Sequence, residues 1–369
     1  MTTLTRRILF LTAAGVAVIA IAAIVTVSAL GAGEGVTRQP SIPGDALRVL
    51  GKNAGLRIGT AVNMDKLNSD EQYTTIAATQ FSTVTPENVM KWEAVEPQRG
   101  HYDWSKADKL VAFAQEHGQL VRGHNLVWNS QLPEWLNKAA PSMSKDELKA
   151  VLKKHVIDEV THFKGKIWQW DVVNEATDDS AQLSDDIWYQ ALGEEYIADA
   201  FTWAHEADPG AKLFLNNYGM EFVGPKADAE LALAKKLKAQ GVPIDGVGFE
   251  AHLDVSFGMP DIYTQLSTFA DAGFDVAVTE LDVRSLLPLN ANAVSEQNDV
   301  YAMMLNSCLQ VPRCISFTVW GFEDTLSWIP EVYPVQGAGD IYDHYEPKSE
   351  YAVLQQVLKN APKTTELRR

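Results

Sequence analysis

Residues 274–282 read FDVAVTELD, a short and mainly apolar run that ends in acidic side chains. Residues 315–320, ISFTVW, form a second run of the same kind. Near-continuous apolar runs of this length are typical of parallel strands that are buried on both faces. The two runs therefore predict a parallel sheet covered by helices, with polar groups where the strands end.

Six further apolar runs alternate with amphipathic segments along the chain. The eight expected strands cover residues 56–62, 81–85, 120–124, 167–174, 213–216, 246–252, 276–281 and 315–320, and the expected helices cover 106–117, 145–163, 186–207, 226–240, 262–272 and 296–309. Pro209, Gly210 and Gly273 mark returns from helix to strand. Eight alternating units predict an α/β fold of the (β/α)8 TIM-barrel type in a single domain, rather than an open sheet.

The N-terminus predicts export. Arg6 and Arg7 precede an uncharged run up to residue 33, which is typical either of a cleaved signal peptide or of an uncleaved signal anchor, because about 20 apolar residues span a bilayer. Residues 34–45 contain prolines and small polar residues and are predicted to form a linker. We expect the barrel over residues 46–360, a polar tail over 361–369, and a location that is secreted, extracellular or membrane-anchored.

The charge balance argues against polyanionic partners. The chain carries 48 acidic and 31 basic residues, a formal net charge of −17, so nucleic acid and acidic lipid surfaces would be repelled. Ten tryptophans and eleven tyrosines suit a neutral, ring-bearing ligand, although most of these rings are expected in the core. Neither a GxGxxG sequence nor a P-loop is present, which together with export disfavours a nucleotide-binding fold.

The chain has two cysteines, Cys308 and Cys314. An even count in an exported protein favours a disulfide, and two buried free thiols are the alternative. A metal site at this position is not expected, because two thiols without nearby histidines do not supply four ligands.

Polar side chains follow nearly every expected strand. Active sites of such barrels lie at the C-terminal ends of the strands, so these side chains should meet at one rim. In strand order they are Glu87, Asn88, His124, Asn174, Glu175, Asn216, Asn217, Tyr218, Glu250, His252, Glu280, Asp282 and Trp320. So many charges at one rim are hard to explain as structural, because buried charges are costly unless they are paired.

Glu175 and Glu280 are the strongest candidates in this set for a pair of catalytic carboxyl groups. Each follows a strongly apolar strand, and strands four and seven lie across a barrel mouth from each other. Cleavage of a glycosidic bond needs two carboxyl groups that flank it, one to donate a proton and one to attack carbon or activate water. For either glutamate alone, an ordinary buried ion pair is the structural alternative. No lysine ends a strand and no metal-ligand spacing is evident, so we expect neither a cofactor nor a metal.

Five strings in order resemble glycoside hydrolase family ten, the endo-β-1,4-xylanases. They are TPENVMKW (85–92), RGH (122–124), WDVVNE (170–175), TELDVR (279–284) and TVWG (318–321). The likeness covers nearly all of residues 58–358. Each string alone is a moderate signal, and their order and spacing make it a strong one.

The resemblance implies a monomeric, retaining endo-β-1,4-xylanase that hydrolyses xylan or its oligosaccharides through a glycosyl-enzyme intermediate. Glu175 would be the acid/base and Glu280 the nucleophile. Asn174 would hold the 2-hydroxyl of the sugar, while His252 and Asp282 would form a relay that keeps Glu280 ionised. The residues implied around the substrate are Glu87, Asn88, Lys91, His124, Trp128, Trp320 and Trp328 on the glycone side and Tyr218 on the leaving-group side. Cys308 and Cys314 match a disulfide position of the family.

Four positions depart from the family pattern. The family usually has histidine where Asn129 stands, glutamine where Glu250 stands, and an Asp-Tyr-Asn pattern where Asn217 and Gly219 flank Tyr218. We expect Asn129 and Glu250 to lie around the reacting sugar. Because like charges at close range raise at least one pKa, we also expect Glu250 to stay protonated or to pair with a new partner.

Two other functions follow from these departures. One is a related β-glycosidase with an altered sugar specificity, since the site and not the fold decides the substrate. The other is a catalytically weakened, surface-displayed carbohydrate-binding protein. The presence of Glu175, Glu280, His252 and Asp282 weighs against the latter, because sugar binding alone needs no acid and nucleophile. Turnover of non-xylose aryl glycosides would favour the first, and ligand binding without turnover the second.

Overall fold

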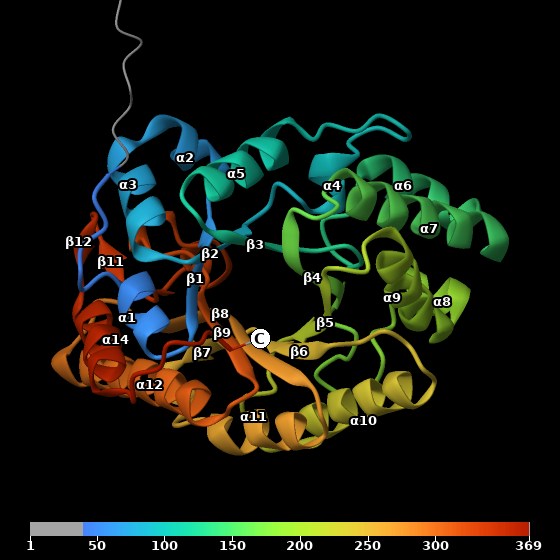
Figure 1. Cartoon of the computed structure of the whole chain (residues 1–369). Helices are drawn as coiled ribbons and strands as arrows, with labels where there is room; N and C mark the ends of the chain where they lie inside the picture. Colours follow the sequence, from blue (N-terminus) through green and yellow to red (C-terminus); the bar gives the residue numbers. More distant parts are fainter. Residues whose placement is uncertain (1–39, 369) are drawn as a thin grey trace, which may run out of the picture. The chain divides into compact units, whose positions relative to one another are not determined.

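The computed structural model describes residues 40–368 and shows a closed barrel of eight parallel strands (Figure 1). The strands are β1 (Arg57–Val62), β2 (Thr83–Pro86), β3 (Leu120–Gly123), β4 (Ile167–Asn174), β5 (Lys212–Asn217), β6 (Gly246–Phe249), β8 (Asp275–Leu286) and β9 (Cys314–Val319). Strand β9 pairs with both β8 and β1, which closes the barrel. The predicted (β/α)8 fold is therefore confirmed. The predicted export segment over 1–33 and the first part of the predicted linker lie outside the described residues.

Helices surround the strands (Figure 1). The longer ones are α3 (Glu71–Gln80), α5 (Ser105–Glu116), α7 (Lys145–His162), α9 (Glu195–Ala207), α10 (Pro225–Ala239), α11 (Ile262–Asp271), α12 (Ala291–Gln310) and α14 (Ser349–Asn360), and the shorter ones are α1 (Leu47–Asn53), α2 (Met64–Ser69), α4 (Trp92–Val95), α6 (Glu134–Ala139), α8 (Ile187–Leu192) and α13 (Ile329–Val332). Between residues 40 and 368, none of these helices combines the length and the apolar character needed to cross a bilayer.

One helix and one strand of the sequence analysis are each divided in two. The expected helix over 186–207 is split into α8 and α9 at Gly193, whose φ of 71° only glycine adopts without cost. The expected strand over 246–252 ends at Phe249, and the chain resumes as β7 (His252–Asp254) after Ala251, which has a φ of 62°. Strand β7 pairs with the longer β8 and places His252 directly opposite Asp282.

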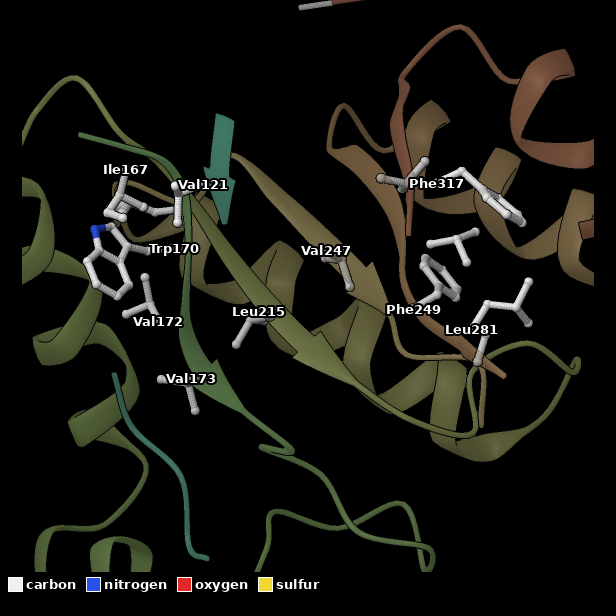
Figure 2. Close-up of a cluster of buried hydrophobic side chains, with 14 of the residues drawn as sticks. Val121, Ile167, Trp170, Val172, Val173, Leu215, Val247, Phe249, Leu281 and Phe317 are labelled. Carbon is white, nitrogen blue, oxygen red and sulfur yellow. The ribbon is translucent and has the colours of Figure 1, made fainter. Parts of the chain in front are cut away.

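Apolar side chains of neighbouring strands form the core around the site. Figure 2 shows part of this cluster, with Trp170 on β4, Leu215 on β5, Phe249 on β6 and Phe317 on β9, all fully buried. Close packing of such rings fixes the strands and therefore the groups at their ends. The barrel supplies a rigid rim for the polar side chains that follow each strand.

The predicted disulfide between Cys308 and Cys314 is present and joins the end of α12 to the start of β9. The tail beyond α14 packs against the same corner. The Arg368 guanidinium donates hydrogen bonds to the carbonyl oxygens of Cys308, Val311 and Cys314 at 2.7–3.0 Å and to that of Leu309. Cys308 and Leu309 lie in the last turn of α12, where helix carbonyl oxygens run short of helical partners, so a cation at this position complements the helix dipole.

We predict that Arg368→Ala lowers the unfolding temperature by about 2–5 °C, because several charge-assisted hydrogen bonds to carbonyl oxygens are lost together. Thermal denaturation followed by circular dichroism measures the change. Lys363→Ala, on an exposed residue of the same tail, is the matched control and should have no measurable effect. Equal unfolding temperatures for Arg368→Ala and the parent would contradict the capping role.

Candidate active site

Glu175 and Glu280 line one hollow of about 570 Å³ at the C-terminal ends of the barrel strands. Glu175 directly follows β4, and Glu280 lies within β8. Glu175 has a φ of 56°, a conformation that costs a non-glycine residue about 1–3 kcal/mol and that is concentrated at functional sites. The sequence-based pairing of these two glutamates is therefore reproduced in space.

The Glu280 carboxylate is buried among groups that favour its ionised form. The Arg122 guanidinium and the His124 ring lie 3.6 and 3.7 Å from its Oε1. The Asn216 amide donates to the same oxygen at 2.8 Å, and His252 Nε2 lies 3.3 Å from Oε2. Burial disfavours the charge, but these neighbours overcome it and lower the pKa of Glu280 to about 2. Glu280 is therefore a carboxylate over the working pH range.

His252 lies between two carboxylates. Its Nδ1 donates to Asp282 Oδ2 at 2.9 Å, and the Trp328 indole donates to the same oxygen at 2.8 Å. Burial disfavours the imidazolium, but the charges of Asp282 and Glu280 raise the pKa of His252 well above its ordinary value. A positive ring therefore faces Glu280, in the arrangement that the resemblance implies.

The pKa of Glu175 is shifted in the opposite direction to that of Glu280. Burial, together with the negative charge of Glu280, raises the pKa of Glu175 above its ordinary value. Asn174 Nδ2 lies 3.4 Å from Glu175 Oε1. Two carboxyl groups whose environments separate their pKa values in this way divide into an acid and a base or nucleophile. The geometry thus supplies a proton donor and an anion on one hollow.

Glu250 forms the third carboxyl group of this site and is 3% exposed. Asn216 Nδ2 lies 2.8 Å from Asn174 Oδ1, 2.8 Å from Glu280 Oε1 and 3.1 Å from Glu250 Oε1, so its two hydrogens are shared among three acceptors and the amide lies between the carboxyl groups of Glu250 and Glu280. Burial and the charges of Glu280 and Glu175 raise the pKa of Glu250 well above its ordinary value. Within residues 40–368, no lysine or arginine forms an ion pair with Glu250. Of the two expectations from the sequence, protonation is the one that the structure favours.

The glycone wall contains the predicted Glu87, Asn88, Lys91, His124, Trp128, Trp320 and Trp328. Lys91 Nζ donates to Asn88 Oδ1 at 2.9 Å and lies 5.1 Å from the Trp128 ring centroid. It also donates to Gln131 Oε1 at 2.6 Å. Gln131 lines the hollow as well but was missed by sequence reasoning, because it lies in a loop away from any strand end.

Tyr218 lines a second hollow of about 650 Å³. This hollow shares Glu250, His252 and Trp328 with the first and adds the aromatic rings of Phe222, Phe257 and Tyr333. The two hollows therefore meet at Glu250, His252 and Trp328. Tyr218 lines the hollow that does not contain Glu87, Lys91 or Trp128, which are expected on the glycone side.

The structure places two of the four departures away from the hollows. Asn129 is exposed and lines neither of them, so the expectation that it lies around the reacting sugar is corrected. Asn217 is fully buried, and its amide donates to Thr177 and to Glu230 Oε2 at 3.0 Å. An aspartate at position 217 would set a second carboxylate against Glu230, which explains the amide.

Three buried polar residues lie beside the catalytic groups without lining either hollow, namely Arg122, Asp171 and Asn216. Arg122 Nε donates to Asp171 Oδ1 at 3.1 Å, and both side chains are buried. The RGH string contained Arg122, but no specific role was assigned to it. Asp171 lies inside the apolar strand β4, and a charged residue in a buried strand was the signal that could have identified it.

This arrangement defines a hydrolytic site for glycosidic bonds, in which a barrel rim holds one carboxyl group with a raised pKa and one with a lowered pKa. The chain belongs to glycosyl hydrolase family 10, whose model matches residues 46–357.

Relatives and solved structures agree with this assignment. Endo-1,4-beta-xylanase C of Phanerodontia chrysosporium is 42% identical over 301 residues, or 80% of this chain and 75% of that protein. Endo-1,4-beta-xylanase B of Thermotoga neapolitana is 37% identical over 320 residues, or 85% and 91% of the two chains. The structure of xylanase 10B from Thermotoga petrophila in complex with xylobiose has a TM-score of 0.83 at 37% identity and covers 87% of this chain and 99% of that chain.

We predict that His252→Gln moves the acid limb of the kcat/KM–pH profile to higher pH by about one unit or more. Glu280 must be ionised, so activity is lost as the pH falls through its pKa, and removing the imidazolium raises that pKa. Initial rates measured where circular dichroism shows the folded state test this. His344→Gln, at an exposed histidine, is the control and should leave the acid limb in place. An unmoved acid limb in His252→Gln would contradict the relay.

We predict that Glu250→Gln changes the alkaline limb of the kcat/KM–pH profile from a two-proton to a one-proton transition. Glu175 must be protonated, so activity falls as the pH rises through its raised pKa, and in the parent Glu250 ionises beside it. The parent limb should therefore reflect two coupled protons, whereas the variant limb should fit a single proton. Superimposable profiles would show that Glu250 carries no titrating charge at the site.

Proposed function

We propose that this chain is a retaining endo-β-1,4-xylanase that hydrolyses xylan by double displacement. The observation that carries the proposal is that Glu175 and Glu280 line one hollow and have pKa values shifted in opposite directions. The relatives described above are named endo-1,4-β-xylanases, and a similar solved structure contains xylobiose, which supports this substrate class.

In the first step, Glu175 donates its proton to the glycosidic oxygen while Glu280 attacks the anomeric carbon. The leaving sugar departs, and Glu280 becomes a neutral ester. In the second step, the Glu175 carboxylate takes a proton from water, which attacks the anomeric carbon and releases Glu280. The loss of the Glu280 charge in the intermediate removes one cause of the raised Glu175 pKa, so Glu175 turns from an acid into a base.

The supporting groups act on these two steps. His252, held by Asp282, keeps Glu280 ionised before attack. Asn174, oriented by Asn216, would hold the 2-hydroxyl of the reacting sugar, an interaction that strengthens in the transition state. The ring faces of Trp320 and Trp328 offer stacking surfaces for sugar rings.

The two adjoining hollows support cleavage within a chain. The glycone hollow and the hollow lined by Tyr218 meet at Glu250 and His252, so sugars can lie on both sides of the scissile bond. An enzyme that trims chain ends needs only one extended side. We therefore propose endo action.

We also propose that the protein acts outside the cytoplasm, either secreted or held at the membrane. Arg6, Arg7 and the uncharged run up to residue 33 support export. Residues 34–45 would then form the linker between this segment and the barrel.

We predict that the protein releases reducing ends from soluble xylan and that Glu280→Ala lowers the rate by at least about 10⁴-fold, because no nucleophile is left. NMR of the first product should show the β-anomer, since double displacement retains configuration. Glu159→Gln, at a buried carboxyl group outside the hollows, is the control and should retain activity.

Two outcomes would overturn the proposal. An α-anomer as first product would rule out double displacement. Folded protein that leaves xylan intact would rule out xylan as the substrate, and a panel of other β-glycans would then test the altered-specificity alternative.

A further inference from the structure

We propose that Glu250, His252 and Glu280 form a binding site for a divalent transition-metal ion such as Zn²⁺, and that the bound ion inhibits the enzyme reversibly. One ligand atom from each of the three side chains lies within 4.8 Å of the other two. The three residues come from separate parts of the chain: Glu250 directly follows β6, His252 begins β7 and Glu280 lies within β8, so no local motif reveals the set.

The histidine is oriented as a metal ligand requires. Its Nδ1 donates to Asp282 at 2.9 Å, which leaves Nε2 directed at Glu280 Oε2 at 3.3 Å. Ligands held at about 2.0–2.2 Å around a tetrahedral zinc ion lie about 3.4 Å from each other. The His252 and Glu280 atoms therefore already have the spacing of two zinc ligands, and Asp282 is the outer carboxylate that fixes such a histidine.

The ligand types select the class of ion. One imidazole and two carboxylates suit zinc and similar borderline ions, whereas Ca²⁺ and Mg²⁺ need six or more oxygen ligands. When the ion binds, the proton of His252 Nε2 and the proton of Glu250 both leave to solvent, because metal ligands must be deprotonated. Glu250 and His252 line both hollows, so the fourth position is open to water or to a sugar hydroxyl.

Glu250 is the residue that creates this site. A glutamine at position 250 would offer only a neutral amide oxygen, whereas Glu250 becomes an anionic ligand once the ion displaces its proton. The other group with suitable spacing, His124, Asp171 and Glu280, is less suited, because Asp171 is already paired with the Arg122 guanidinium. A cation there would compete with a fixed positive charge.

Occupancy of the site would stop catalysis. The ion would bind the Glu280 carboxylate that attacks the sugar and the His252 ring that tunes it. It would also lie where the two hollows meet, so substrate and metal should exclude each other.

The test is titration of the purified full chain, without a polyhistidine tag, with Zn²⁺ in a non-coordinating buffer by isothermal calorimetry. We expect one site whose dissociation constant rises at least tenfold in Glu250→Gln. His344→Ala, which removes an exposed histidine beside Asp343, controls for adventitious binding and should leave that site unchanged. Equal affinity in Glu250→Gln and the parent, or no binding by the parent up to about 1 mM, would overturn the proposal.

The second measurement is competition between Zn²⁺ and substrate. Of the two measurements, this one alone rests on the proposed function. Zn²⁺ should inhibit xylan hydrolysis competitively, EDTA should restore the rate, and the inhibition constant should rise at least tenfold in Glu250→Gln. Inhibition of equal strength in Glu250→Gln would overturn the proposal. Because calorimetry needs no turnover, a protein inactive on xylan would still give a clear result for the metal site.

Discussion

The buried ion pair between Arg122 and Asp171 is the interaction on which the site depends. Arg122 reaches from β3 to Asp171 on β4 and also donates to the Thr279 carbonyl oxygen on β8 at 3.0 Å. Asp171 in turn holds His124 at 2.9 Å. Removing either partner would leave an unpaired buried charge, at a cost of about 3–5 kcal/mol. The pair therefore ties three strands together and fixes the positive groups around Glu280.

That positive environment decides which carboxyl group is ionised. Glu175, Glu250 and Glu280 share a buried rim, and like charges so close cannot all persist. Burial disfavours the charge of all three, but His124, His252 and Arg122 lie beside Glu280 and lower its pKa, whereas the pKa values of Glu175 and Glu250 are raised. The division of roles between acid and nucleophile follows from where the cations lie, since the side chains are chemically identical.

The strand pattern and the strand-end residues were predictable from the sequence because each reflects a local rule. Apolar runs of strand length predicted the barrel, and the barrel rule placed Glu175 and Glu280 on one rim. The division of the strand expected over 246–252 into β6 and β7 was not predictable, because nothing in the local sequence indicates a positive φ at Ala251. Gln131 and Asn129 show the same limit: loop conformation brings Gln131 to the hollow and leaves Asn129 exposed.

Three of the four departures from the family pattern have a local structural account, and this bears on the alternative of a catalytically weakened protein. Asn217 replaces a carboxylate where Glu230 already provides one at 3.0 Å. Burial and the charges of Glu280 and Glu175 raise the pKa of Glu250, which disfavours a further negative charge beside the nucleophile. Gly219 takes a φ of 70°, which favours glycine, and lines the same hollow as Tyr218. Glu175, Glu280 and His252 make the contacts described above, so these three departures give no physical reason for a loss of catalysis.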